Sequence, residues 1–502
     1  MDAVSKLISP VPGVFFTVLG GYFVIMAWIG YVASKKTTTL GEFFVMNGKA
    51  GAVVSGLAYF ATQYSMSTFM GCPATCYKVG YAGLTISVPG LVFSMIIPAL
   101  LIGRKLIRLG HRYGFLTMAD YLADRYESDG IRSLLAVMMV VFMIPLMGAQ
   151  TIGAGIIWRT FTGQPEWVGI VLMGVIVIIY CMSGGIRGAM LTDVIQGSLM
   201  VLTAILTFII SVRIGGGFEA INRKLLEMNP AYLSHPGIGG VYGWGNYVSM
   251  IVMWSFFSIG QPSLSTKFFA MKDYKVMFKA VILGTIGMWL AATLIEWAGV
   301  NAIVSIPGLE GKQIDFVVPL ILQQQISPVF SALLIAGIVA AGMSTIDSLL
   351  IVSTGAITRD IYQKIVNKNA SDADIFRLSR YVTIVIGIVA IVFGISRPGT
   401  IFKLVLFAFG GLGIWAAPIL MGMYWKRATK QGAIPSVVGG VAVYIVISMH
   451  FKSWALGFNP LLVSWCIAML VHYVVSLATS PNSESTIRSE ERRVGKECRS
   501  RW

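Results

Sequence analysis

About thirteen apolar runs, each long enough to cross a lipid bilayer, follow one another along this chain of 502 residues. Their centres fall near residues 23, 63, 92, 144, 175, 201, 255, 287, 341, 387, 412, 441 and 468. Apolar residues make up 56% of the sequence and charged residues only 12%, which a soluble core does not explain. We therefore predict an all-α polytopic membrane protein that has the lipid bilayer as its solvent.

The formal net charge of +16 is carried mainly by loops that alternate along the chain. This asymmetry fits an odd number of spans with the N-terminus outside and the C-terminus inside. The basic residues assigned to the cytoplasmic side include Arg104, Lys105, Arg108, Arg112, Lys267, Lys272, Arg359 and Lys426. The charge therefore predicts an orientation in the cytoplasmic (plasma) membrane, and we expect no nucleic acid partner.

The pattern of reactive side chains does not favour an enzyme. The cysteines, at positions 72, 76, 181, 466 and 498, match neither a disulfide framework nor metal-ligand spacing. The four histidines are scattered, and no nucleophile–base pair or phosphate-cradling loop stands out. The run from Phe15 to Val32 lacks a basic leader and is expected to be a retained first span.

The composition changes abruptly after the last apolar run. Residues 488–502 read RSEERRVGKECRSRW, a charged stretch with no apolar period. A disordered basic tail is one interpretation. We favour another, that the stretch is the translated read-through of a sequencing-library adapter, and exclude it from the fold. The prediction is a transmembrane domain over residues 1–480 and a cytoplasmic tail over 481–502.

Two apolar runs are interrupted by polar residues, glycine and proline. The first is GLAYFATQYSMSTFMGCPATCYKVG, from Gly56 to Gly80, and the second is WSFFSIGQP, from Trp254 to Pro262. A helix broken at membrane depth frees backbone carbonyls, which are tolerated where they line a cavity or bind a cation. Two such segments, one in each half of the chain, indicate a transporter built from inverted repeats with a midplane site.

A third run, IVAAGMSTIDSLLIVS over residues 338–353, has one polar face. Ala341, Ser344 and Ser348 share a sector of about 60°, with Thr345 and Asp347 on its flanks. An oxygen-rich face inside a membrane suits a hard cation such as sodium.

Structural alternatives exist for each polar residue of these runs. A serine or threonine can bond back to the carbonyl four residues earlier, and Asp347 can be held by a structural partner. Asp193 can pair with Arg187 or cap a helix. Trp254 and Phe257 are also compatible with simple packing.

Three stretches carry a specific resemblance to a known family. They are GGIRGAMLTDVIQGSLM at 184–200, AAGMSTIDSLLIVSTGAITRDIY at 340–362 and FGGLGIWAAPILMGMYWKRATKQGA at 409–433. The chain resembles the sodium:solute symporter family, which includes sodium-coupled proline, pantothenate, sialic acid and glucose transporters. The resemblance implies thirteen spans, an external N-terminus and a five-plus-five inverted-repeat core like that of bacterial leucine transporters.

The resemblance also implies cation sites. A sodium ion would be held by the backbone carbonyls of Ala61, Tyr64 and Ala341 and by the hydroxyls of Ser344 and Thr345. Some members carry a second sodium site, and the matching positions are Asp193, Ser344, Asp347 and Ser348. Asp347 departs from the small polar residue that is often found there. Sodium is therefore the expected coupling ion.

The substrate implied by the resemblance is a small organic solute. The stretches at 409–433 and at 259–275 are most similar to sodium/pantothenate symporters. Sodium/proline carriers share the second interrupted segment but have an acid where this chain has Gln63. The residues implied for the substrate pocket are Gln63, Ser67, Thr68, Trp254, Phe257, Ser258, Phe409, Gly410 and Gly411.

We therefore expect a sodium-coupled symporter that imports a small organic solute, with pantothenate as the best candidate. Proline or another carboxylate or amino acid is an alternative substrate. A proton-coupled carrier of the same fold is a second alternative, with Asp193 or Asp347 as the proton acceptor. A membrane sensor and a membrane enzyme are less favoured. The sequence does not determine the oligomeric state.

Overall fold

The computed structural model describes residues 7–35, 40–324, 327–449, 455 and 457–482. Within these ranges the chain is almost entirely helical and contains no strand. The fold class predicted from the apolar runs is therefore confirmed. The stretch at 488–502, interpreted as a translated adapter, lies outside the described residues.

Ten helical stretches of the described chain are long and apolar enough to cross a membrane. They are Pro12–Ala33, Tyr81–Tyr113, Asp129–Thr162, Ile186–Ile214, Tyr274–Ser305, Pro328–Val366, Asp372–Ser396, Ile401–Tyr424, Lys430–Met449 and Pro460–Ala478. A shorter apolar helix covers Glu166–Ile179. Together with the two interrupted segments, these stretches match the thirteen predicted apolar runs, although Glu166–Ile179 and Ile186–Ile214 belong to one continuous helix, Glu166–Ile214.

The helices that matter most for the site are α3 (Ala52–Gln63), α4 (Cys72–Val79), α11 (Trp244–Gly260), α12 (Pro262–Ala270) and α15 (Pro328–Gly355). The other long ones are α1 (Pro12–Ser34), α5 (Tyr81–Pro98), α8 (Asp129–Thr162), α9 (Glu166–Ile214), α13 (Tyr274–Ser305), α16 (Asp372–Ser396), α17 (Ile401–Gly413), α18 (Ala416–Tyr424), α19 (Lys430–Met449) and α20 (Pro460–Ala478). Short helices connect them: α2 (Leu40–Val45), α6 (Arg104–Tyr113), α7 (Met118–Tyr126), α10 (Phe218–Met228) and α14 (Val317–Gln323).

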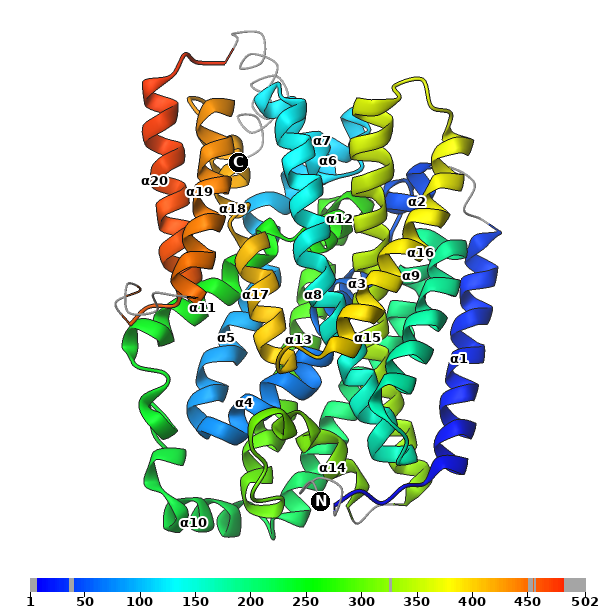
Figure 1. The fold of residues 1–502 in the computed structure, drawn as a ribbon, viewed down its shortest axis with the longest axis vertical. Helices are drawn as coiled ribbons and strands as arrows, with labels where there is room; N and C mark the ends of the chain where they lie inside the picture. Colours follow the sequence, from blue (N-terminus) through cyan, green and yellow to red (C-terminus); the bar gives the residue numbers. More distant parts are fainter. Residues whose placement is uncertain (1–6, 36–39, 325–326, 450–454, 456, 483–502) are drawn as a thin grey trace.

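The centre of the bundle is occupied by α15, which packs against α9, α8, α1 and α3 (Figure 1). Every residue of α15 from Leu334 to Gly355 is buried. By contrast α1 lies at one edge, where Trp28 is 65% exposed, and α19 and α20 pair at another. Helix α15 is therefore enclosed by protein, so its hydroxyl and carboxyl groups face other helices rather than lipid.

The two interrupted segments are both broken, as predicted. Helix α3 ends at Gln63, where Tyr64 adopts an extended conformation (φ −94°, ψ 122°), and a π-helical turn over Ser67–Gly71 leads into α4. Helix α11 ends at Gly260, and Gln261 is extended (φ −95°, ψ 107°) before Pro262 begins α12. A residue that precedes proline is driven away from the helical region, so this second break is fixed by the sequence itself.

The two ends of the bundle differ in their chemistry. Helix α1 begins at one end, here the N-terminal end, and α20 finishes at the other, here the C-terminal end (Figure 1). At the C-terminal end, Asp120 of α7 accepts from Arg132 at 2.9 Å and from Arg359 at 2.6 Å. Asp360 lies 3.4 Å from Arg359 and accepts a hydrogen bond from Thr117 at 3.1 Å. These four charges join α7, α8 and the helical turns that follow α15.

Two of the basic residues assigned to loops were placed wrongly. Lys267 lies in α12, is completely buried and pairs with Asp193 at 3.1 Å. Arg359 is 6% exposed and belongs to the charge network with Asp120. A hydropathy argument treats each basic residue as the marker of a loop. It cannot detect that an acid on a distant helix pairs with the basic residue and so allows its burial.

We expect Asp120→Asn to lower the free energy of unfolding of the purified protein by about 3 kcal/mol, because the substitution leaves two buried guanidinium groups with Asp360 and the exposed Asp129. Burial alone would raise the pKa of Asp120, but Arg359, the amide of Leu116 and Arg132 hold it below its ordinary value. The stabilisation is therefore complete at neutral pH and is lost only below about pH 4. Thermal melting in one detergent tests this, with the exposed Asp372→Asn as control; equal melting of the two variants contradicts it.

Candidate cation and substrate site

Two hydroxyls of α15 meet the end of α3. Ser344 Oγ donates to the carbonyl of Ala61 at 2.8 Å and also lies 3.1 Å from the carbonyl of Ala341. Thr345 Oγ1 lies 3.1 Å from the same Ala341 oxygen and 3.3 Å from the carbonyl of Thr62. Five oxygen atoms from two helices far apart in the sequence therefore gather at one place.

The break in α3 explains why these carbonyls are accessible. In a continuous helix, the carbonyls of Ala61 and Thr62 would accept from the amides of residues 65 and 66. The Ser65 amide instead donates to Thr68 Oγ1 at 3.4 Å, and the Met66 amide donates to Gln150 Oε1 at 2.8 Å. The freed carbonyls turn to the hydroxyls of α15.

The donor set fits a monovalent hard cation. All the converging atoms are neutral oxygens, and their residues are at most 2% exposed. Neutral carbonyl and hydroxyl oxygens suit sodium, whereas zinc or copper would need nitrogen or sulfur ligands. Among the described residues, no cluster of three or more His, Cys, Asp or Glu side chains could hold a metal.

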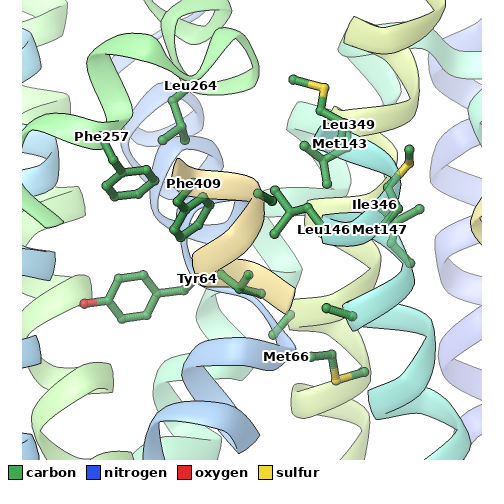
Figure 2. Close-up of a cluster of buried hydrophobic side chains, with 14 of the residues drawn as sticks. Tyr64, Met66, Met143, Leu146, Met147, Phe257, Leu264, Ile346, Leu349 and Phe409 are labelled. Carbon is green, nitrogen blue, oxygen red and sulfur yellow. The ribbon is translucent and has the colours of Figure 1, made fainter. Parts of the chain in front are cut away.

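Tyr64 belongs to the same break, but its side chain points elsewhere. Its phenol donates to the carbonyl of Met288 on α13 at 2.7 Å, and Figure 2 shows the ring directed away from Ile346 and Leu349 of α15. The amide of Thr68, the helical partner of the Tyr64 carbonyl, bonds Ser65 instead at 2.9 Å. Only the backbone oxygen of Tyr64 is therefore suited to a cation.

The residues predicted for a second cation site lie around the junction of α1, α3, α9 and α15. Ser348 Oγ is 3.0 Å from the hydroxyl of Thr62. Asp193 and Asp347 both lie within electrostatic range of the Tyr22 phenol. Asp193 is engaged by the ammonium of Lys267, so a cation bound there would have to share the carboxylate with that group.

The alternative pairing considered for Asp193 is wrong. Arg187 pairs with Glu42 of α2 at 3.1 Å, whereas Asp193 pairs with Lys267. Lys267 was missed as an intramembrane charge. The sequence could have indicated this burial, since Lys267 follows the second break by only six residues.

Three aromatic residues assigned to the substrate pocket form one cluster. Phe257 of α11 and Phe409 of α17 have ring centroids 4.3 Å apart, and Trp254 lies edge-on to both at 5.6 Å. Figure 2 shows Phe257 and Phe409 side by side, with Leu264 of α12 nearby. The cluster therefore holds α11 against α17 beside the break of the second interrupted segment.

The small residues assigned to the same pocket have structural partners. A Cβ atom on Gly410 would overlap the ring of Tyr444, and one on Gly411 would overlap Phe142. Ser258 Oγ donates to the carbonyl of Ser94 at 2.6 Å. Ser67 and Thr68 lie in the π-helical turn after the break. The two glycines therefore allow α17 to approach its neighbours closely.

Several buried polar atoms near the two breaks have no hydrogen-bond partner in the protein. They are both amide atoms of Gln63, the indole nitrogen of Trp254 and Oε1 of Gln261. Such atoms are costly to bury unless something else bonds them. Gln261 was not among the predicted pocket residues, although its place before Pro262 marked it as the second break.

A large cavity of about 800 Å³ lies toward the N-terminal end of the bundle. It is lined by Tyr77 and Lys78 of α4, by Leu309 and Asp315, and by Phe402 of α17. The ring of Phe402 lies 6.4 Å from that of Trp254, so the cavity reaches the aromatic cluster. At the opposite end, the network around Asp120 ties the helices together.

The sequence that forms this site matches the profile of a known family. The profile of the "Sodium:solute symporter family" matches residues 43–440, which include both breaks and α15. The chain belongs to this family. The family resemblance predicted from the sequence is therefore confirmed, and the symporter is a multi-pass plasma membrane transporter, not an enzyme, with sodium as its coupling ion.

Two curated relatives span nearly the whole symporter. The sodium/pantothenate symporter of Escherichia coli K12 is 28% identical over 466 residues, covering 91% of this chain and 95% of its own. The osmoregulated proline transporter OpuE of Bacillus subtilis 168 is 24% identical and covers 94% and 96%. The two relatives carry different substrates at similar identity, so neither assigns one to this symporter.

Solved structures agree with the fold. A Na⁺-coupled sialic acid symporter in a substrate-bound, outward-open state has a TM-score of 0.80 at 21% identity, covering 94% of this chain and 99% of that one. The inward-facing Mhp1 transporter has a TM-score of 0.55 at 13% identity, with coverage of 88% and 95%. At these identities the likeness shows the fold alone, which is that of the inverted-repeat symporters.

We expect Ser344→Ala and Thr345→Ala each to raise the sodium concentration that half-activates transport by roughly tenfold, because an oxygen bound to a cation contributes at least about 1.4 kcal/mol. Sodium-dependent thermal stabilisation of the purified variants measures the same affinity without a substrate. Ser353→Ala is the matched control, since Ser353 is also buried in α15 but contacts Met143. Unchanged sodium dependence in both site variants contradicts the assignment.

Proposed function

We propose that this symporter uses the inward sodium gradient to import a small organic anion, with pantothenate as the best candidate. The observation that carries the coupling is the convergence of Ser344 and Thr345 on the freed carbonyls of Ala61 and Thr62. A sodium ion at this place would join α15 to the broken helix and so favour one conformation of the core. A substrate that needs the same conformation would then bind more tightly.

The proposed substrate class rests on the chemistry of the buried atoms. Gln63, Gln261 and Trp254 supply amide and indole groups beside a wall of aromatic rings. Neutral donors and acceptors of this kind suit the hydroxyl, amide and carboxylate groups of a pantothenate-like molecule. The sodium/pantothenate symporters among the relatives support this choice, and the proline transporters supply the competing one.

We propose that the C-terminal end of the bundle faces the cytoplasm. Helix α6 carries Arg104, Lys105, Arg108 and Arg112 at that end (Figure 1). Basic residues are retained on the cytoplasmic side during insertion. In this orientation the cavity of about 800 Å³ opens to the outside, and the network around Asp120 closes the inner face.

The contribution of the membrane potential to the proposed transport cycle depends on the net charge that crosses the membrane. A membrane potential of 100 mV contributes about 2.3 kcal/mol for each net positive charge moved inward. Co-transport of one sodium with a monovalent anion would be electroneutral, so a second cation would be needed for the potential to drive uptake. Asp347 and Ser348 are the residues that we propose for such a second site.

The function is tested by uptake of labelled pantothenate into proteoliposomes with and without an inward sodium gradient. We expect sodium to raise the initial rate at least about tenfold, because the coupled site is filled only when sodium is present. Excess unlabelled proline should leave this uptake unchanged. Sodium-driven uptake of proline but not pantothenate would contradict the substrate and keep the coupling. Pantothenate uptake that depends steeply on pH and not on sodium would contradict the sodium coupling and keep the substrate.

We expect Gln63→Met to weaken substrate binding roughly tenfold while leaving thermal stability unchanged or slightly raised. Neither amide atom of Gln63 bonds the protein, so a side chain of similar volume without polar atoms removes a buried cost. The apparent KM for uptake and the melting temperature are the two measurements. A variant that binds substrate normally but melts earlier would show that Gln63 is structural.

A further inference from the structure

Glu296 of α13 is a buried acid that neither cation site uses. Glu296 is 0% exposed and lies within the spanning segment Tyr274–Ser305. One carboxylate oxygen, Oε2, accepts from Ser87 of α5 and from the thiol of Cys76 of α4, the latter at 4.0 Å. The other oxygen, Oε1, has no hydrogen-bond partner.

Glu296 lacks the counter-charge that three other buried acids have. Asp193 is paired with Lys267, and Asp120 and Asp360 are paired with Arg132 and Arg359. Within the described residues, no lysine, arginine or histidine forms an ion pair with Glu296. An isolated carboxylate without a counter-charge is strongly disfavoured in such a place, whereas a carboxylic acid is tolerated.

The groups that contact Glu296 or lie in its electrostatic range are thiols, phenols and a hydroxyl, none of which carries a positive charge. Those in its electrostatic range are Cys72 and Cys76 of α4, Tyr64 at the first break and Tyr242 before α11. Helix α5 contributes the hydroxyl of Ser87. On another side of α13, α9 contributes the hydroxyl of Ser211, which accepts from Asn301 at 2.9 Å. All of these groups are neutral when they carry their protons.

We propose that Glu296 is a proton-binding site and that the conformation described here holds it in the protonated form. Its position links this proton to the moving part of the core. Cys72 and Cys76 belong to α4, the second half of the broken helix, and Ala74, Thr75 and Lys78 of the same helix line the large cavity. A shift of α4 that closes the cavity changes the contacts of Glu296.

The proposal predicts pH-dependent transport that is set by one residue. Deprotonation leaves a charge among two thiols and two phenols, so raising the pH disfavours this conformation. Glu296→Gln has the shape of the protonated acid and keeps a hydrogen-bonding side chain, so it should hold the site in its loaded form at every pH. Glu310→Gln is the matched control, since Glu310 is exposed and lies at the rim of the same cavity.

The first test does not depend on any substrate. Infrared difference spectra of the full-length protein in lipid, recorded between neutral and alkaline pH in H2O and D2O, should show the carbonyl band of a neutral, buried carboxylic acid. The band should be present in the wild type and in Glu310→Gln and missing from Glu296→Gln. A wild-type spectrum that the Glu296→Gln substitution does not change overturns the proposal.

The second test measures sodium-driven uptake against pH and rests on the proposed function. We expect the wild-type rate to fall at alkaline pH with a slope approaching about tenfold per unit, and the Glu296→Gln rate to vary less than about twofold. A Glu296→Gln profile like that of the wild type overturns the proposal. So does an inactive Glu296→Gln protein that is still stabilised by sodium. If the wild type transports neither pantothenate nor proline, the proposed function fails, while the infrared band still decides the proton site.

Discussion

The site depends on one constraint, that a helix broken inside a membrane must find new partners for its freed backbone groups. There is no bulk water at this depth, and an unsatisfied carbonyl or amide costs several kcal/mol. In this protein Gln150 and Thr68 take the freed amides, and Ser344 and Thr345 take the freed carbonyls. The contacts that satisfy the break are the same atoms that could bind a cation. Stability and ion binding therefore use one set of oxygens, and this explains how an ion could control the relative position of α3 and α15.

Buried charged side chains also need partners inside the bundle. The network around Asp120 holds the C-terminal end of the bundle, and the Asp193–Lys267 pair joins α9 to α12. Each carboxylate there has a nearby cation, because a pair is far less costly to bury than a single charge. Glu296 differs, since its contacts are a hydroxyl and thiols. The C-terminal end is thus held by a network of paired charges, and the large cavity lies toward the N-terminal end, where Glu166 pairs with Arg159 and Arg397.

Much of the architecture followed from local sequence. Apolar runs predicted the spans, and proline, glycine and polar residues predicted both interrupted segments. Pro262 directly follows the second break, whereas the first break lies at Tyr64, before the π-helical turn that leads to Pro73. The polar face of α15 was predicted from helical periodicity. The partners of charged residues were not predictable in this way. Lys267 was assigned to a loop, and pairing with Arg187 was one structural alternative considered for Asp193. The two residues instead pair with each other across 74 positions of the chain.

The sequence by itself determined that this is a membrane-spanning helical transporter. It also determined which two segments are interrupted and which side chains of α15 are polar, since these features depend on hydropathy, periodicity and proline. Only the tertiary structure decided what those groups meet. It placed the hydroxyls of α15 on the carbonyls of α3 and packed Gly410 and Gly411 closely against neighbouring helices. It also left the side-chain amide of Gln63 and Oε1 of Gln261 without a hydrogen-bond partner in the protein. It also enclosed Glu296 without a counter-charge. The reason is that hydrogen bonds and ion pairs inside the bundle join residues up to hundreds of positions apart. The energy of these contacts depends on burial, which a local sequence pattern does not predict.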